Sequence, residues 1–270
     1  GSVNQSGMDF YIKLLDALQA RNIKAFVTLY HWDLPQYLQD NGGWLNRDTA
    51  YKFAAYADVV SQAFGERVYS YATLNEPFCS AYLSYEAGIH APGVQNRQAG
   101  RQVAHHLLLA HGLAMQVLRK NAPKALHGIV LNFSPCHPAS DSAADTRAAE
   151  MADQYHNQWY IQPLLEQCYP PLLQQLAEEE RPLIAEGDMA IIAQPLDFLG
   201  VNYYTRTVYR ANDKGWFSDV PPTTPPLTDM GWEIYPQGLT EILLAMHKRY
   251  KLPPVYITEN GAAMPDTLEN

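Results

Sequence analysis

The sequence has few cysteines, few charged side chains and no long hydrophobic segment, and each shortage argues against a class of protein. Three cysteines, Cys79, Cys136 and Cys168, are too few and too widely spaced for a disulfide framework or a CxxC metal site. We therefore expect free thiols in a reducing compartment, which favours the cytoplasm. No apolar run approaches the roughly 18 to 20 residues that a transmembrane helix needs, and no secretory signal opens the chain.

Basic residues are also scarce. The chain has 19 Lys and Arg against 28 Asp and Glu, a formal net charge of -9. This balance disfavours nucleic acid and anionic membranes as partners, and it does not indicate a substrate. With 270 residues, 47% of them hydrophobic, the composition is that of one large globular domain. The chain begins at Gly1 without an initiator methionine, so we expect it to be part of a longer protein.

Helical and strand patterns alternate along the chain. Apolar residues recur at helical spacing in some segments, and short β-branched or aromatic runs separate them. The predicted helices cover residues 8–21, 47–64, 101–121, 143–160 and 237–250, and the predicted strands cover residues 24–30, 68–74, 128–133, 197–204 and 255–258. Residues 168–195 contain short helical pieces. Residues 211–229 are rich in proline and are predicted to form an irregular loop without a core of its own.

This alternation predicts an α/β fold with parallel strands. Five strands cannot close a barrel that needs about eight. We therefore predict that residues 1–270 form a single partial domain, an incomplete (β/α)8 TIM barrel that covers about strands three to seven. The alternative is an open, doubly wound sheet. We favour the barrel because polar and aromatic residues follow every predicted strand.

Two predicted strands end in a glutamate. Glu76 lies in YATLNEP and Glu259 in VYITENG, and a proline or a glycine then ends each strand. In parallel barrels the carboxyl ends of the strands face one cleft, so these two carboxylates are predicted to meet there. Two carboxyl groups in different environments are what hydrolysis of a glycosidic bond requires, one ionised and the other protonated.

The sequences TLNEP and YITENG resemble the two active-site signatures of family 1 glycoside hydrolases, the β-glucosidase family. The resemblance implies a retaining β-glycosidase of the β-glucosidase type, with Glu76 as the acid/base and Glu259 as the nucleophile. Retention implies carboxyl groups about 5 to 5.5 Å apart and a covalent glycosyl-enzyme intermediate. The expected partner is a small β-glucoside, without a cofactor or a metal.

Other motifs extend the resemblance to the sugar site. His31 and Trp32 in LYHWDLP match the family motif that contacts sugar hydroxyls. Asn75 matches the asparagine that binds the 2-hydroxyl. Gly88 to Gly93 begins a long loop on the same side as Glu76, and within it His90 is a candidate for a supporting role, as is Asn132.

Three further matches come from the second half of the chain. Asn202 and Tyr204 in GVNYYTR match positions where the tyrosine hydroxyl holds the nucleophile carboxylate, and the neighbouring Tyr203 is expected to pack on the other side of the strand. Trp232 in MGWEIYP resembles the tryptophan platform for the aglycone. Phe78 stands where the family often has tryptophan, which leaves an aromatic wall of altered shape.

Two alternative functions are also compatible with these motifs. One is a non-catalytic sugar-binding remnant, which would have no need for two opposed carboxylates. The other is a 6-phospho-β-glycosidase, although Tyr235 is more typical of the non-phosphorylated branch. The glycone-binding residues that the family takes from its first and last strands have no match in these 270 residues.

Overall fold

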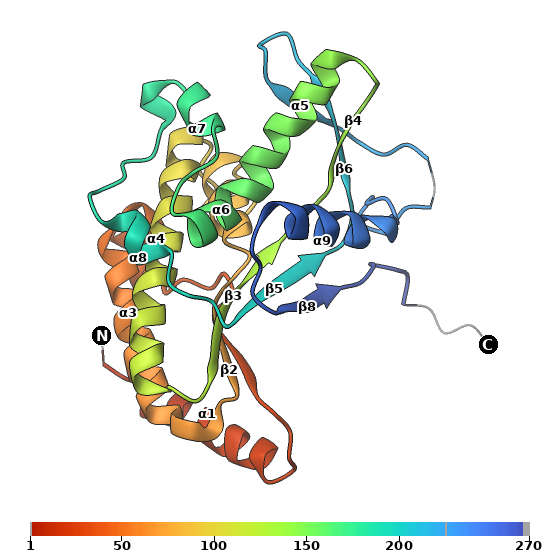
Figure 1. Ribbon diagram of the computed structural model, residues 1–270. Helices are drawn as coiled ribbons and strands as arrows, with labels where there is room; N and C mark the ends of the chain where they lie inside the picture. The colour runs from red at the N-terminus through yellow and green to blue at the C-terminus, as the bar shows by residue number, and fades with distance from the viewer. Residues whose placement is uncertain (1, 225, 267–270) are drawn as a thin grey trace, which may run out of the picture.

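The main sheet has five parallel strands. The computed structural model describes residues 2–224 and 226–266 (Figure 1). The strand order is β1-β2-β3-β5-β8 and every pair is parallel. The strands are β1 (Phe26–Tyr30), β2 (Ser70–Asn75), β3 (Leu126–Asn132), β5 (Phe198–Tyr203) and β8 (Val255–Asn260). All five predicted strands are present, and the prediction of an α/β fold with an incomplete barrel is confirmed.

Long helices precede or connect these strands. They are α1 (Gln5–Gln19), α3 (Asp48–Phe64), α4 (Arg97–Asn121), α5 (Ala143–Asp153) and α9 (Gln237–Arg249). Side-chain caps fix the starts of three of them, since Asn4, Asn96 and Ser142 each accept a hydrogen bond from a backbone N–H three residues later. The cap on Asn96 explains why α4 begins four residues before the predicted start.

Short helical segments lie between the long ones. The chain passes through α2 (Gln36–Asp40), η1 (Gly43–Leu45), η2 (Gly65–Arg67), η3 (Cys79–Glu86), η4 (Gln154–Gln158), α6 (Trp159–Glu166), α7 (Leu172–Gln175), η5 (Glu178–Glu180) and α8 (Asp188–Ile192). The short pieces predicted over residues 168–195 are therefore present. The single helix predicted over 143–160 is three consecutive segments, because the π-helical turn η4 separates α5 from α6. Both η3 and η4 are π-helical, a geometry that is frequent at functional sites.

The prediction for residues 211–229 is wrong in its first half. Residues 207–211 and 217–220 form the antiparallel hairpin of β6 (Thr207–Ala211) and β7 (Phe217–Val220). Strand β6 also pairs with β4 (Cys136–Pro138), which lies outside the predicted strands. Asn212 closes the hairpin, since its side chain accepts from the N–H groups of Lys214 and Trp216. Phe217 packs against buried Tyr209, so the segment does have a small core.

The core lies between the sheet and α3 and α4, which run side by side along one face (Figure 1). Most of α4 is buried. Two glycines permit close contacts there. A Cβ on Gly112 of α4 would lie 2.0 Å from the Ile191 carbonyl oxygen, and one on Gly128 of β3 would lie 2.3 Å from the Phe198 carbonyl oxygen.

Strands β1 and β8 are the two edges of the sheet. No further strand pairs with either outer edge among residues 2–224 and 226–266. The edge strand β8, which contains Glu259, is mostly exposed, and Ile257 within it is 45% exposed. The two edge strands do approach each other, since the rings of Phe26 and Tyr256 are 5.7 Å apart. The sheet thus curves, as part of a barrel does.

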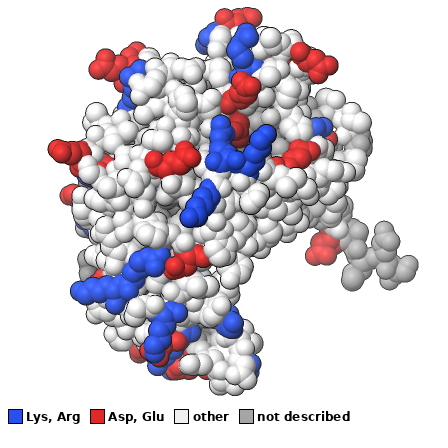
Figure 2. Space-filling model, viewed as in Figure 1, with Lys and Arg blue, Asp and Glu red and all other residues white. Residues whose placement is uncertain are grey.

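Acidic and basic side chains are interspersed on the surface, with wide uncharged areas between them on the face shown in Figure 2. Within the described ranges, no helix is long and apolar enough to cross a membrane.

Candidate active site

Glu76 follows β2 directly and is held on both carboxylate oxygens. Its Oε1 accepts a hydrogen bond from Asn202 Nδ2 at 2.6 Å, and its Oε2 accepts one from Cys79 Sγ at 3.1 Å. The side chain is buried, with 5% exposure. Its backbone has φ +47°, a left-handed conformation that is unusual for a residue other than glycine. Such strain is typical of functional sites, and here it turns the chain sharply between β2 and η3.

Glu259 lies in β8 and is partly buried. Its Oε2 accepts a hydrogen bond from the Tyr204 hydroxyl at 2.6 Å. Burial, reinforced by this hydrogen bond and by the charges of both Glu259 and Glu76, raises the pKa of Tyr204 well above its usual range. The phenol therefore keeps its proton and acts as a donor to the carboxylate.

Asn202 connects the first carboxylate to two other strands. Its Nδ2 also donates to Asn75 Oδ1 at 3.2 Å, and its Oδ1 accepts from Thr258 Oγ1 at 2.6 Å. Because the Glu76 carboxylate accepts and the Thr258 hydroxyl can donate, this pattern fixes which end of the amide faces Glu76. β2, β5 and β8 therefore meet in one polar network, which is buried at Asn75, Glu76 and Asn202 and reaches the surface at Thr258.

His31, Trp32 and Asn75 form one group beside this network. Asn75 Nδ2 is 3.3 Å from His31 Nε2, and the Trp32 indole N–H donates to the Asn75 carbonyl at 3.0 Å. Trp32 has φ +80°, so the loop after β1 also turns through a strained residue. The His90 ring lies 5.6 Å from the Trp32 ring, which brings the predicted supporting residue to the same side of the molecule.

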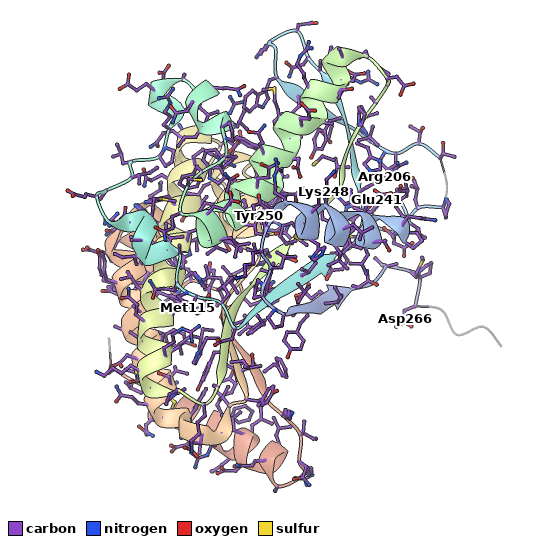
Figure 3. All side chains as sticks on the ribbon, viewed as in Figure 1. Met115, Arg206, Glu241, Lys248, Tyr250 and Asp266 are labelled. Carbon is purple, nitrogen blue, oxygen red and sulfur yellow. The ribbon has the colours of Figure 1, made fainter. Side chains whose placement is uncertain are left out.

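Trp232 is 40% exposed, and its ring lies 5.8 Å from that of Tyr204. The next residue, Glu233, accepts two hydrogen bonds from Arg206, at 2.7 and 2.9 Å. Arg206 lies next to Glu241 at the start of α9 (Figure 3), and His137 contacts both of them. This ionic cluster anchors the segment that carries Trp232 to the end of β5.

Tyr203 packs as expected. It is buried, and its hydroxyl donates to the Tyr235 carbonyl. Phe78 stacks on Tyr82, with ring centroids 5.0 Å apart. Both rings line a cavity of about 680 Å³ that extends to the β6–β7 hairpin. Neither Glu76 nor Glu259 lines this cavity.

The structure thus gathers the predicted site residues at the carboxyl ends of β1, β2, β5 and β8, with Trp232 reaching in from the segment before α9. Two members of the network were missed, Cys79 and Thr258. Both are close in sequence to a glutamate, since Cys79 follows Glu76 by three residues and Thr258 precedes Glu259, but closeness in sequence does not predict either contact. Within the described part of the chain, no group of three His, Cys, Asp or Glu side chains could hold a metal ion.

Two carboxylates at the carboxyl ends of two strands in one parallel α/β sheet, each held by a donor from another segment, form the architecture of a barrel glycosidase. The whole chain, residues 1–270, matches the sequence model described as Glycosyl hydrolase family 1. The chain therefore belongs to that family.

Curated relatives and solved structures agree with this assignment. The chain is 42% identical to a "Beta-glucosidase" of Agrobacterium sp. over 276 residues, which cover 100% of this chain and 60% of that protein. It is 44% identical to the AHE enzyme from Alicyclobacillus herbarius, with a TM-score of 0.94 over 100% of this chain and 62% of that one. The virulence factor SghA, solved with its substrate analog salicin, is 41% identical with a TM-score of 0.94 and 61% coverage of its chain. The chain thus spans about 60% of the length of these relatives.

Proposed function

We propose that the whole protein containing this chain is a retaining β-glucosidase that hydrolyses small β-glucosides, with Glu76 as acid/base and Glu259 as nucleophile. One observation carries the proposal. Asn202 donates to Glu76 Oε1 and is paired with Glu259 in the register of β5 against β8, so the two glutamates lie on either side of one buried asparagine. Their surroundings differ, because Glu76 is buried with two donors and Glu259 is partly buried with one.

The proposed reaction has two steps. In the first, a Glu259 carboxylate oxygen bonds to the anomeric carbon while Glu76 gives its proton to the glycosidic oxygen. The glycosidic bond breaks, and the aglycone leaves as an alcohol. In the second, Glu76, now ionised, takes a proton from water. The water oxygen bonds to the anomeric carbon and displaces the Glu259 carboxylate, so the sugar retains its β configuration.

The surrounding residues have matching proposed roles. The hydrogen bond from Tyr204 holds one oxygen of Glu259 and leaves the other for attack. Asn75 and His31 offer polar atoms for sugar hydroxyls beside Glu76. Trp32 and the exposed ring of Trp232 provide two aromatic surfaces, and the apolar faces of sugars and aglycones pack on such rings.

The proposal extends to the organisation of the protein. Residues 1–270 are proposed to be one partial catalytic domain, completed in the whole protein by further strands. Free thiols at Cys79, Cys136 and Cys168 fit a reducing compartment, so we propose the cytoplasm as its location. No separate observation favours the sugar-binding remnant or the 6-phospho-β-glycosidase.

The stereochemistry of the product tests the function. The whole protein is incubated with 4-nitrophenyl β-glucoside, and proton NMR follows the anomeric signals of the first glucose released. We expect β-glucose first, with α-glucose appearing only by mutarotation. Release of α-glucose first would exclude the retaining mechanism. A parallel reaction with the 6-phosphorylated glucoside should be much slower, and the reverse preference would support the phospho-glycosidase. Glu150→Ala, at an exposed position of α5, serves as a control that should leave the rate and the stereochemistry unchanged.

A further inference from the structure

The thiol of Cys79 lies against the carboxylate that we propose as the acid/base. Cys79 is the first residue of η3, and its backbone N–H donates to the Glu76 carbonyl at 2.9 Å. This tight turn brings the side chain back over Glu76, with Sγ 3.1 Å from Oε2. The thiol is buried, with 6% exposure, so it is shielded from bulk solvent.

The direction of this hydrogen bond is determined by the two partners. An ionised carboxylate only accepts hydrogen bonds. Burial raises the pKa of the Cys79 thiol well above its usual range, and the charges of Glu76 and Glu259 raise it further. The sulfur therefore keeps its proton at every pH at which the protein would work, and its S–H donates to Oε2.

The two oxygens of Glu76 have donors of unequal strength. On Oε1 an amide N–H from Asn202 forms a short bond of 2.6 Å to the carboxylate. On Oε2 the donor is a thiol, which is a weak one. A proton added to Glu76 must give up or weaken the donor bond on the oxygen that takes it. Protonation therefore costs less at Oε2, and this oxygen is the one that carries the exchangeable proton.

We propose that Cys79 is a positioning residue for the acid/base. Its S–H fixes the plane of the Glu76 carboxyl group and stabilises the ionised form only weakly, so that Oε2 can be protonated for the first step and ionised for the second. This inference rests on the proposed function, in which Glu76 performs both proton transfers.

Other groups near Glu76 act on different atoms. The titratable side chains of the neighbouring strands that belong to the same network are Tyr204, which follows β5, and Glu259 of β8. The Tyr204 hydroxyl is bonded to Glu259, while His31 contacts Asn75 through Nε2 and Trp32 through its ring. Replacing Cys79 therefore changes the donor on Oε2 and leaves the bonds to Oε1 and to Glu259 in place.

The test compares pH–rate profiles of kcat/KM for the whole protein and two variants. The substrate is a glucoside with a poor leaving group, whose cleavage needs the acid. Cys79→Ala removes the donor, so we expect the alkaline limb to move to higher pH by about half a unit to one unit. Cys79→Ser keeps a donor, and a hydroxyl is a stronger one than a thiol, so its limb should stay at the wild-type position or move to lower pH. Cys168→Ala removes an exposed thiol and is the matched control, with an unchanged profile.

The outcomes separate this inference from the proposed function. An alkaline limb that does not move in Cys79→Ala, or that moves equally in Cys79→Ala and Cys79→Ser, overturns the role of the thiol. Glu76→Gln is measured beside them with a 2,4-dinitrophenyl glucoside, which leaves without protonation. If Glu76→Gln loses the alkaline limb and the limb of Cys79→Ala stays at the wild-type pH, only the inference about the thiol fails. If Glu76→Gln keeps the limb, the acid/base assignment itself fails.

Discussion

Asn202 Nδ2 lies 2.6 Å from Glu76 Oε1, so an amide on β5 holds a carboxylate that follows β2. Strand β3 separates these two strands in the sheet. The register of β5 against β8 shifts between Val201 and Asn202, and this irregularity pairs Asn202 with Glu259. Irregularities of this kind often re-aim side chains near active sites. Both proposed catalytic glutamates therefore depend on the position of this asparagine.

Asn202→Ala should lower kcat/KM roughly 10- to 100-fold, because a hydrogen bond to a charged group contributes about 1.5 to 3 kcal/mol. The Thr258 hydroxyl also loses its acceptor. Steady-state kinetics with 4-nitrophenyl β-glucoside would measure the effect. Because Asn75 shares the amide, the double variant with Asn75→Ala should lose less than the sum of the two single losses. Strict additivity would show that the two act independently. Asn121→Ala, which removes an asparagine bonded to Asp58 away from the site, is the control.

Glu259→Ala should abolish hydrolysis, and added azide should restore turnover of 2,4-dinitrophenyl β-glucoside. The small anion can occupy the space that the carboxylate leaves and attack the anomeric carbon from the same side. The product should therefore be α-glucosyl azide, identified by NMR. The matched variant Glu76→Ala should instead give β-glucosyl azide through the covalent intermediate. A β-azide from Glu259→Ala would remove Glu259 from the role of nucleophile.

Tyr204→Phe removes the only described hydrogen bond to the Glu259 carboxylate oxygens and keeps the ring that packs on Trp232. We expect kcat to fall roughly 10- to 100-fold, by the same estimate for a charged hydrogen bond. Stopped-flow and steady-state assays would show which of the two steps slows. Tyr37→Phe changes an exposed hydroxyl and should have no effect. A Tyr204→Phe enzyme of wild-type rate would mean that the phenol does not orient the nucleophile.

Sequence periodicity predicted the main sheet well, because its strands are short apolar runs bounded by breakers and its helices have clear apolar stripes. The β6–β7 hairpin was missed because the prolines after Val220 concealed the alternation of Phe217 and Asp219 with their neighbours. Tertiary contacts determine the structure of that segment. Phe217 packs against a cluster formed by Tyr209 with Ala149 and Ala152 of α5, and local propensity does not detect such contacts.

The site residues were predictable where a motif carries them, as in NEP and TENG. The thiol of Cys79 and the hydroxyl of Thr258 were not, because each acts through a contact across the fold or across a turn whose π-helical geometry no local pattern indicates. The exposure of β8 could not be predicted either. A run of apolar and β-branched residues indicates a buried strand, but the strand is buried only if a neighbouring strand covers it.

Buried histidines should make the protein lose stability in mild acid. His111 is fully buried in α4, its Nδ1 lies 2.7 Å from Thr73 Oγ1, and burial lowers its pKa to about 3. In the unfolded chain the pKa is close to the ordinary 6.5, so below that pH the unfolded state binds a proton that the folded state does not. The contribution of His111 is constant above this range and is lost as the pH falls from about 6.5 towards 3.

Urea unfolding of the whole protein at pH 7.5 and pH 5.5 would measure this loss. The linkage relation gives about 1.4 kcal/mol for one such histidine over this interval. His111→Gln should reduce the difference between the two pH values by that amount, whatever its effect on stability at pH 7.5. His247→Gln, at an exposed position of α9, should leave the difference unchanged. An unaltered difference in His111→Gln would show that this imidazole does not resist protonation in the folded state.

Residues 1–270 expressed alone should be inactive and should associate, whereas the same chain completed by further barrel strands should be monomeric or a defined oligomer and active. The outer edges of β1 and β8 are unpaired in the described part of the chain, and an unpaired strand edge is a template for association. Apolar side chains on these strands, Phe26, Tyr256 and Ile257, are exposed.

Burial of apolar surface contributes about 25 cal/mol per Å², so leaving two edges of the barrel without their neighbouring strands and helices costs tens of kcal/mol. This cost exceeds the net stability of a domain, which is about 5 to 15 kcal/mol. Size-exclusion chromatography beside a nitrophenyl glucoside assay tests the prediction on both forms. Lys and Asp substitutions at Phe26 and Ile257 provide a second measurement, since charges on an edge should reduce association without restoring activity. A monomeric and active 270-residue protein would show that these edges do not need a cover and that the residues gathered around Glu76 and Glu259 form a complete site.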